Sequence, residues 1–475
     1  MAQRRLRLSP PDDRVIAAAF AALRDDLGIP AGFAADVLAD AEAAARAPRL
    51  PDADETAIPF VTIDPPGSRD LDQALHVERR GPGYLVRYAI ADVARFVAPG
   101  GSIDREAHER GQTLYAPDRN VPLHPPRLSE DAASLLPDTT RPALVWTMAV
   151  DAGGEGVEVD VRHAVVRSRR QLDYAGVQRA LDAGTAEEPL QLLREVGLLR
   201  QEREVAQDGI DLPLPDQEVE LGPGGYRLAF RVPLPVEGWN AQVSLMTGQA
   251  AAELMLGAGI GILRTLPEAD TGAVARLRRT AAALGVDWPA ELGYASLVRT
   301  LDPAQPTHAA FLAESTVLLR GSGYAAFDGG PPGQPVHAGV GAPYAHATAP
   351  LRRLVDRYVG ETCVAICAGA DVPEWARAAL PALPEAMERS TSRAQQYEAG
   401  ILSAVEAAVL EHRVGDVFGA VVVEVDGDGE GGTVQLTDPA VTARCVGVDL
   451  PLGDRVDVRL VLADVVARQV RFELA

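Results

Sequence analysis

The order of apolar and polar positions divides the chain into helical and strand-rich stretches. The first fifty residues are rich in alanine, and their spacing predicts helices over Asp13 to Leu27 and Ala31 to Arg46. Gly28 and Pro30 separate the two helices. We expect this pair to form either a helix-turn-helix-like cap or a plain helical hairpin.

In the middle of the chain, the spacing of apolar residues changes once, from a strand pattern to a helical one. Short runs of alternating apolar and polar residues favour strands from Ala57 to about Pro235. The clearest predicted strands are Ala57 to Ile63, Tyr84 to Val93, Ala143 to Val150 and Val157 to Val166. Beyond Asn240 the period becomes helical. The predicted helices there are Ala273 to Gly285, Leu312 to Gly321, Leu351 to Ala368 and Glu385 to His412.

The last part of the chain returns to a strand pattern. Its predicted strands are Val417 to Val425, Thr433 to Leu436, Thr442 to Val446, Arg455 to Leu462 and Val466 to Leu474. Five short strands in succession predict a small barrel, for which an OB-fold is the leading candidate. We therefore predict a multidomain α+β protein. Its parts are an N-terminal helical segment over 1–50, a mixed α/β domain over 57–413 and a five-stranded barrel over 414–475.

Composition narrows the class of protein. A chain of 475 residues with 47% hydrophobic residues is long enough for two or three domains. Its formal net charge is -22, which argues against a nucleic-acid partner because phosphate contacts need cationic side chains. All 45 basic residues are arginine, however, and arginine binds phosphate in a bidentate manner. A local arginine-lined channel for a polyanion therefore stays compatible with the composition.

Cysteines and apolar runs indicate the compartment. Cys363, Cys367 and Cys445 show no zinc-site spacing, so we expect reduced core thiols and no disulfide-linked partner. The N-terminus lacks the apolar stretch of a signal peptide. The longest apolar run, Ala250 to Leu263, is shorter than the ~20 residues of a membrane span. We expect a cytoplasmic protein without a membrane partner.

Three carboxylates close together are the strongest chemical feature. Asp64, Asp70 and Asp72 follow a predicted strand, with Pro65 and Pro66 turning the chain between them. Oxygen ligands of this kind suit a hard divalent cation such as Mg²⁺. The alternative is a solvated acidic turn. The interleaved apolar residues favour a half-buried segment, in which a carboxylate needs a partner.

Two sequence blocks resemble the signature motifs of the RNase II/RNase R family, also called the RNB family. The first is Ile63-Asp64-Pro65 followed by Asp70-Leu-Asp72-Gln73-Ala74. The second is Tyr344-Ala-His346-Ala-Thr348-Ala-Pro350-Leu-Arg352-Arg353-Leu-Val-Asp356. Two blocks in the right order, about 280 residues apart, are more specific than either alone. The resemblance runs from about Ile58 to Val359, and the tail resembles the RNA-binding S1 domain.

The resemblance implies an Mg²⁺-dependent exoribonuclease that degrades single-stranded RNA from the 3′ end and releases 5′-nucleoside monophosphates. We expect it to act as a monomer, with Mn²⁺ as a possible substitute ion. The residues implied as catalytic are Asp64, Asp70, Asp72 and Arg352, and the implied metal ligands are Asp64, Asp70, Asp72 and Gln73. The implied RNA-binding residues are Tyr115, Arg352, Arg353 and Glu398.

Each implied role has a structural alternative. Tyr115 would stack on the terminal base, or else it is a core tyrosine. Arg352 would clamp a phosphate, and Pro350 suits the first turn of a helix whose N–H groups face phosphate. Arg353 is as well explained by a structural ion pair. Glu398 is otherwise a solvated helix residue, and we interpret His346 as a hydrogen-bonded structural residue.

Two departures from the family pattern stand out. Gln73 occupies a position where the family usually has a fourth carboxylate, so we expect weaker metal binding or a lower rate. The N-terminal fifty residues cannot form the cold-shock domains with which RNase II and RNase R begin. The sequence therefore supports an active exoribonuclease, with a catalytically impaired protein that binds RNA 3′ ends as the alternative.

Overall fold

A closed barrel of five strands organises the larger part of the protein. The computed structural model describes residues 13–475, apart from 211, 213–215, 223–224, 304, 427–428 and 437. The barrel strands follow one another in space as they do in sequence, and β1 closes the barrel by parallel pairing with β5. They are β1 (Phe60–Ile63), β2 (Gln73–Arg80), β3 (Gly83–Ala91), β4 (Thr140–Val150) and β5 (Gly156–Leu172).

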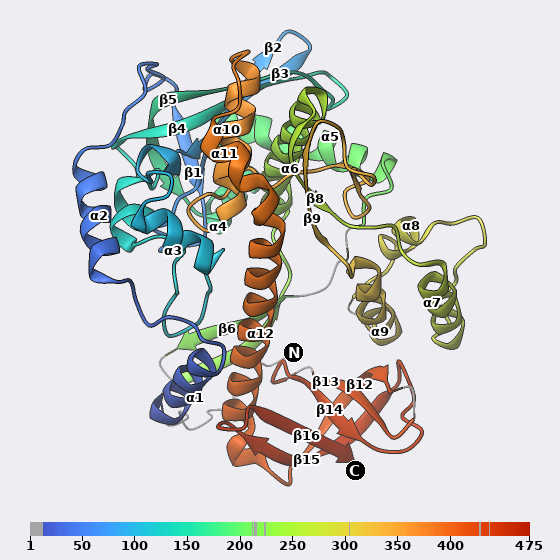
Figure 1. Cartoon of the computed structure of the whole chain (residues 1–475). Helices are drawn as coiled ribbons and strands as arrows, with labels where there is room; N and C mark the ends of the chain where they lie inside the picture. The colour runs from blue at the N-terminus through green and yellow to red at the C-terminus, as the bar shows by residue number, and fades with distance from the viewer. Residues whose placement is uncertain are drawn as a thin grey trace.

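The barrel is covered by helices, which Figure 1 shows on its lower and right-hand sides. These helices are α3 (Ser102–Arg110), α4 (Tyr174–Asp182), α5 (Glu188–Ala206), α6 (Pro235–Ala258), α10 (Leu354–Cys367) and α11 (Glu374–Ala379). The main hydrophobic core lies between the barrel and α5, α6 and α10. Every second residue of β3 enters it, namely Tyr84, Val86, Tyr88 and Ile90.

The predicted strand-rich region is wrong in part, because α3, α4 and α5 lie within it. The longest of them, α5, buries Arg200 beside Leu193 and Val196, whereas its apolar Leu198 and Val205 are exposed. Polar and apolar residues therefore occur on both faces, and the sequence lacks the single apolar stripe that identifies an amphipathic helix.

A small helical lobe projects from the main body and has a core of its own. It comprises α7 (Thr271–Ala283), α8 (Tyr294–Val298) and α9 (Pro306–Ser315). The antiparallel pair β8 (Ile260–Thr265) and β9 (Gly323–Asp328) connects the lobe to the main body. The short pair β10 (Val336–His337) and β11 (Ala342–Pro343) follows.

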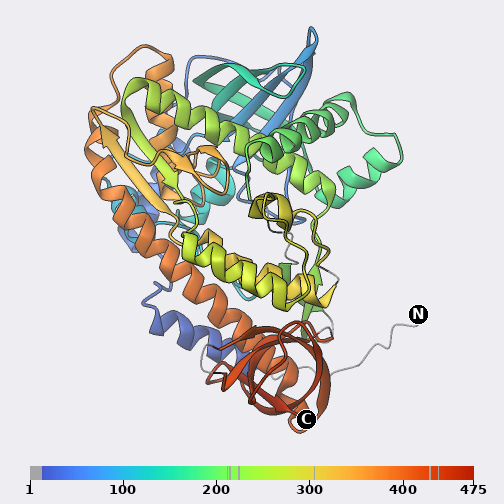
Figure 2. The same ribbon diagram turned by 90° about the vertical axis from the view of Figure 1, so that its right-hand side faces the viewer.

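The C-terminal strands close into a second barrel, which confirms the predicted OB-fold architecture. Its strand order is β12-β13-β14-β16-β15. The strands are β12 (Val417–Val425), β13 (Gly431–Leu436), β14 (Thr442–Val446), β15 (Arg455–Asp464) and β16 (Gln469–Leu474). The long helix α12 (Leu383–Leu410) runs from the main body to this barrel, as Figures 1 and 2 show. The hairpin β6 (Asp216–Gly222) and β7 (Gly225–Arg231) also packs on α12.

The two N-terminal helices do not form a hairpin, so that prediction is wrong. Helix α1 (Asp13–Asp26) packs on α12, whereas α2 (Ala35–Arg46) packs on α3. The apolar residues of α1 and α2 belong to different core clusters. Arg24 of α1 is buried and donates hydrogen bonds to Asp118 and Tyr397, which ties α1 to α12 and to the loop after α3.

Two structural facts bear on the predictions about the cysteines and a membrane span. Cys363, Cys367 and Cys445 are free thiols. Over the part of the chain that the structure describes, no helix combines the length and apolarity that a bilayer crossing needs.

Helix α6 approaches the loop after β11 so closely that a glycine is needed. A Cβ atom on Gly248 would lie 2.2 Å from the Tyr344 ring and 2.5 Å from the carbonyl oxygen of Ala345. The same glycine accepts a hydrogen bond from the Ala345 N–H at 3.0 Å. Any side chain here would push the 344–353 loop away from the barrel.

We expect Gly248→Ala to lower the free energy of unfolding by about 1–3 kcal/mol, because the added methyl group overpacks the contact with Tyr344. Gly257→Ala on the same helix is the matched control, since a Cβ atom there meets nothing within 4 Å. It should leave stability unchanged or raise it by up to about 1 kcal/mol. Urea denaturation measures both, and equal effects would contradict this account.

Candidate active site

Three segments that are distant in sequence meet at one end of the main barrel. The first runs from Asp64 to Gln73, the second from Gly111 to Val121 and the third from Tyr344 to Arg353. Backbone hydrogen bonds join the second to the third, from the Thr113 N–H to the Arg352 carbonyl at 2.9 Å and from the Leu354 N–H to the Gly111 carbonyl at 3.0 Å. Asp72 of the first segment accepts hydrogen bonds from Leu351 and Arg352 of the third, so the two sequence blocks lie together.

Asp64 lies directly after β1, where its N–H bonds to the Leu172 carbonyl of β5 at 3.1 Å. Its Oδ2 atom is buried and has no hydrogen-bond partner. Burial raises the pKa of Asp64 to about 6, an effect that the Arg352 charge opposes and the Asp70 charge increases. An unpartnered buried carboxylate oxygen fits a cation ligand, because it otherwise costs free energy.

Asp72 is the buried centre of the site. Its Oδ1 accepts a hydrogen bond from the Leu351 N–H at 2.7 Å, and its Oδ2 accepts one from Arg352 Nε at 3.1 Å. Burial raises the pKa of Asp72 to about 7, despite the opposing effects of Arg352 and the Leu351 N–H. Asp70 and Asp72 lie in an irregular segment directly before β2.

The predicted helix start at Pro350 is also wrong. Helix α10 begins at Leu354, and residues 350–352 form a turn. The Leu351 N–H, which was expected to face phosphate, is bonded to Asp72 instead. The turn is stabilised by Asp356, whose Oδ1 accepts a hydrogen bond from the Ala349 N–H at 2.8 Å.

Asp70 and Tyr115 lie side by side. The Tyr115 hydroxyl donates a hydrogen bond to Asp70 Oδ2 at 3.1 Å, while 48% of the Tyr115 surface is exposed. Tyr115 is therefore not a core tyrosine. An exposed ring held in place by its hydroxyl is suited to contact a flat ligand group.

Arg352 extends past Asp72 into the open side of the site. Its side chain is 48% exposed, whereas that of Asp72 is 4% exposed. The ion pair uses Nε, which leaves the two terminal amino groups on the exposed side. A guanidinium in this position can donate paired hydrogen bonds to a phosphate.

Gln73 is held by hydrogen bonds at both ends of its amide. The Nε2 group donates to the Thr348 carbonyl at 2.7 Å, and Oε1 accepts from the Tyr88 hydroxyl. Thr348 is bonded in turn to Ser244 of α6 at 2.6 Å. Gln73 thus connects the first and third segments. Its role as a metal ligand stays a prediction. The Tyr88 hydrogen bond uses one lone pair of Oε1, and the other is left for a metal ion.

The other predicted residues lie in different settings. Arg353 pairs with Asp356 through two hydrogen bonds, one of them 2.7 Å long, so its structural role is clear and its RNA contact stays a prediction. Glu398 is exposed on α12 and its role also stays a prediction. His346 is hydrogen-bonded to the Tyr324 hydroxyl at 2.7 Å, and burial lowers its pKa well below the usual value.

Sequence reasoning missed several polar residues around Asp64 and Asp72. They are Tyr88, Tyr174, Asn240, Ser244 and Thr348. Tyr88 had a signal, because it places a hydroxyl in the inward row of β3, which is otherwise mostly apolar. Asn240 and Tyr174, which are bonded to each other at 3.3 Å, had none, since neither lies in a recognisable motif.

The acidic residues fit a divalent cation by their chemistry. Asp64 offers an unpartnered oxygen. Asp70 lies close enough for its charge to raise the pKa of both Asp64 and Asp72. Among the described residues, a set of three ligand-type side chains with all ligand atoms within 4.8 Å is formed by Asp92, His163 and Glu361. That set is distinct from the acidic triplet.

Comparisons with known proteins agree with this geometry. Residues 53–367 match the RNB domain, and residues 416–475 match the RNase II-type exonuclease C-terminal S1 domain. Exoribonuclease 2 of Enterobacter sp. (strain 638) is 32% identical over 325 residues. The matched stretch covers 64% of this chain and 49% of that relative, so the chain spans about half of the relative's length.

Solved structures show the same fold. Mycoplasma genitalium RNase R in complex with ribose-methylated single-stranded RNA is similar with a TM-score of 0.85 and 19% identity, over 98% of this chain and 78% of that one. A yeast pseudonuclease is similar with a TM-score of 0.67 and 17% identity, over 86% of this chain and 51% of that one. The fold is therefore found in proteins described as a ribonuclease and as a pseudonuclease.

The raised pKa values of Asp64 and Asp72 predict a pH-dependent affinity for Mg²⁺ or Mn²⁺. Both carboxyls bind protons more tightly when folded than unfolded, so ionising them as pH rises through about 6 and about 7 destabilises the metal-free fold. A cation requires the ionised forms. We expect Mn²⁺ affinity to rise roughly a hundredfold between about pH 5.5 and about pH 7.5.

Calorimetric titration with Mn²⁺ at several pH values measures this dependence. Asp72→Asn removes the group with the higher pKa, so the remaining increase should be only a few-fold. An affinity that does not change with pH in the unaltered protein would show that these carboxyls are not the ligands.

Proposed function

The chain belongs to the RNB family, and from that premise we propose that it is a metal-dependent hydrolytic exoribonuclease. It acts on single-stranded RNA from the 3′ end and releases 5′-nucleoside monophosphates. The observation that carries this proposal is the arrangement of three groups. The unpartnered oxygen of Asp64, the half-exposed guanidinium of Arg352 and the exposed ring of Tyr115 surround one buried carboxylate, Asp72.

Asp64, Asp70 and Asp72 would hold Mg²⁺, with Mn²⁺ as a substitute and Gln73 as a further oxygen ligand. A bound ion of this kind lowers the pKa of water and offsets the charge of a phosphate undergoing in-line displacement. The protein contributes a buried site in which the carboxylates are fixed beforehand. Asp72 is fixed by the Leu351 N–H, and Asp70 by the Tyr115 hydroxyl.

Arg352 would bind the phosphate next to the bond that is cleaved. Its Nε is fixed by Asp72, which orients the guanidinium and leaves its terminal amino groups for the ligand. Charge builds up on the phosphate oxygens during hydrolysis, so a positioned guanidinium contributes more to the transition state than to binding.

Tyr115 would stack on a terminal base. Stacking depends on the flat face that all bases share, so it contributes affinity without sequence preference. Arg353 and Glu398 would contact the RNA further from the reacting phosphate. Because Arg353 is paired with Asp356, its contribution there is the smaller one.

The second candidate is a catalytically impaired protein that binds RNA 3′ ends. Gln73 is the observation that favours it, because both ends of its amide are engaged in hydrogen bonds and it lacks a carboxylate's charge. Against it stand Asp64, Asp70 and Asp72, which a binding protein does not need. We also propose that the protein acts as a cytoplasmic monomer.

The proposal is tested with single-stranded RNA labelled at the 5′ end and incubated with protein and Mg²⁺ or Mn²⁺. We expect mononucleotides and a shortening labelled RNA, and we expect Asp72→Asn to lower the rate roughly 100-fold or more. Asp371→Asn, on an exposed loop, is the matched control and should keep full activity. Absence of mononucleotides with either ion would favour the binding protein.

Arg352→Ala and Tyr115→Ala should separate catalysis from binding. We expect Arg352→Ala to lower kcat by roughly 100-fold or more while RNA affinity changes little. Tyr115→Ala should instead weaken affinity by about 1–3 kcal/mol, equally for all terminal bases. Single-turnover rates and fluorescence binding curves measure both quantities. Equal losses of rate and affinity in Arg352→Ala would assign this arginine to binding alone.

A further inference from the structure

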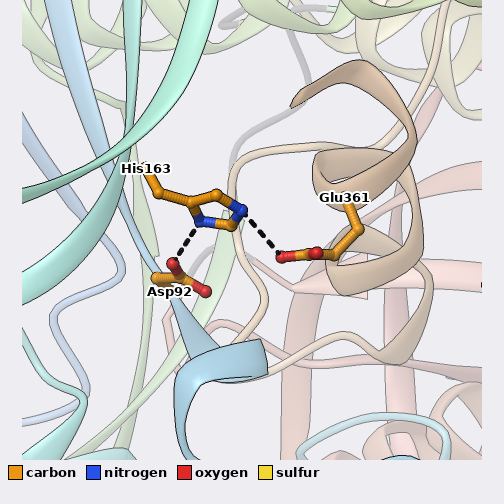
Figure 3. Close-up of side chains that lie close together, drawn as sticks. All are labelled: Asp92, His163 and Glu361. Atoms are coloured by element: carbon orange, nitrogen blue, oxygen red, sulfur yellow. Dashed lines mark hydrogen bonds and ion pairs between the residues drawn. The ribbon is translucent and has the colours of Figure 1, made fainter. Parts of the chain in front are cut away.

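A second group of ligand-type side chains lies outside the site described above. Asp92 follows β3, His163 lies on β5 and Glu361 lies on α10, and their ligand atoms all lie within 4.8 Å of one another. Figure 3 shows the imidazole of His163 between the two carboxylates. No residue of this group belongs to the predicted catalytic or RNA-binding set.

Asp92 fixes the orientation of the imidazole. The Asp92 side chain is 1% exposed, and its Oδ2 lies 2.7 Å from His163 Nδ1. A carboxylate at this distance accepts a hydrogen bond from Nδ1, so the proton of a neutral imidazole is on Nδ1. The lone pair of Nε2 then points away from Asp92 and toward Glu361.

The gap between His163 and Glu361 is unusual. Nε2 and Glu361 Oε1 are 3.6 Å apart, and that oxygen is buried without a hydrogen-bond partner. Two acceptors facing each other in a buried place repel unless a proton or a metal cation lies between them. A proton carried by either the imidazole or the carboxyl would bring the two atoms to about 2.7–2.9 Å.

A shared metal ion explains the observed distance. Zinc binds nitrogen at about 2.0–2.1 Å and carboxylate oxygen at about 2.0–2.2 Å, in a tetrahedral arrangement. Two such ligands of one ion are therefore separated by roughly 3.3–3.5 Å, close to the 3.6 Å between Nε2 and Oε1. The hydrogen bond from Nδ1 to Asp92 is the outer contact that metal-binding histidines usually make.

Space for the remaining ligands lies next to Glu361. A cavity of about 80 Å³ is bordered by Arg49, Ala94, Arg95, Pro99, Glu361 and Trp375. This volume is well above the roughly 10–15 Å³ that one water molecule needs, so water fits beside Glu361. Arg95 Nε bonds to Asp92 Oδ2 at 3.1 Å and offsets its charge. The Arg95 and Arg357 charges also act on Glu361, but burial still raises the pKa of that carboxyl.

We propose that His163 Nε2 and the Glu361 carboxylate bind a divalent transition-metal ion of the zinc class, with Asp92 as the orienting carboxylate and waters completing the shell. The ion would join β5, α10 and the segment after β3. Ala91, the neighbour of Asp92, donates its N–H to the Asp72 carbonyl at 2.9 Å. The site is therefore a structural one that supports the backbone holding Asp72.

The test uses the full chain freed of metal and then supplied with excess Mg²⁺, which occupies sites made of oxygen ligands. Titration with Co²⁺ should give a visible absorption band that saturates at one equivalent, and Zn²⁺ should displace it. The band should lack a thiolate charge-transfer component, since the cysteines are not ligands. Zn²⁺ should also raise the Tm of the metal-free protein.

Variants assign these signals to the cluster. His163→Ala and Glu361→Gln should each lose the saturating band and the Zn²⁺-dependent rise in Tm. Asp92→Asn, which alters the orienting carboxylate and its ion pair with Arg95, should weaken Co²⁺ binding about 10- to 100-fold. His412→Ala removes an exposed histidine elsewhere and should behave like the unaltered protein. Asp72→Asn should likewise keep the band, which separates this site from the active site.

Three outcomes would overturn the proposal. The first is a Co²⁺ band of equal size in His163→Ala and the unaltered protein. The second is a thiolate charge-transfer band, which would place the ion on cysteine. The third is no band, together with a Tm that Zn²⁺ does not change, which would mean that the cluster binds no metal ion.

Discussion

The contact between Asp72 and the 350–352 turn is the constraint on which the site depends. The carboxylate accepts hydrogen bonds from Leu351 and Arg352, which are 279 and 280 residues away in sequence. It lies under the barrel edge, where water cannot replace these partners. The two blocks are thus joined by a single buried acid, and Gln73 adds a parallel connection from the next residue to Thr348. Any shift of the turn moves the arginine and the carboxylate together.

Burying ionised acidic groups costs free energy, and this cost bears on cation binding at the site. Ionising Asp64 and Asp72 in a desolvated place is unfavourable, and this is why burial raises their pKa values to about 6 and about 7. The Arg352 charge and the Leu351 N–H compensate Asp72 only in part. The uncompensated remainder would favour the binding of the cation that we propose for this site. Glu361 in the second cluster follows the same rule, since burial raises its pKa as well.

The predictable parts of this protein are those in which local pattern and global packing agree. The strands of the C-terminal barrel alternate regularly, and their predicted limits differ from the observed ones by only a few residues. The acidic triplet and Arg352 lie in compact motifs, so their proximity followed from the resemblance. Helix α5 was missed because its buried face includes Arg200 and its exposed face includes Leu198 and Val205. The engagement of the Gln73 amide was unpredictable, because its partners Tyr88 and Thr348 come from other segments.

The composition of the C-terminal barrel bears on which part of the protein can bind RNA. Over 414–475 the chain has 5 arginines against 11 aspartates and glutamates, a net charge of -6 that repels phosphate. Phe418 and Phe472 are the aromatic residues of this segment, and they pack on each other inside the barrel at 5.9 Å between ring centroids. The barrel thus offers no aromatic surface for stacking bases. Its extensive packing on α12 indicates a bracing role instead, since α12 extends into the main body beside α10 and α11. In the larger domain, Tyr115 and Arg352 lie on the exposed side of an otherwise buried site, so the stacking and phosphate contacts that we propose belong to that domain.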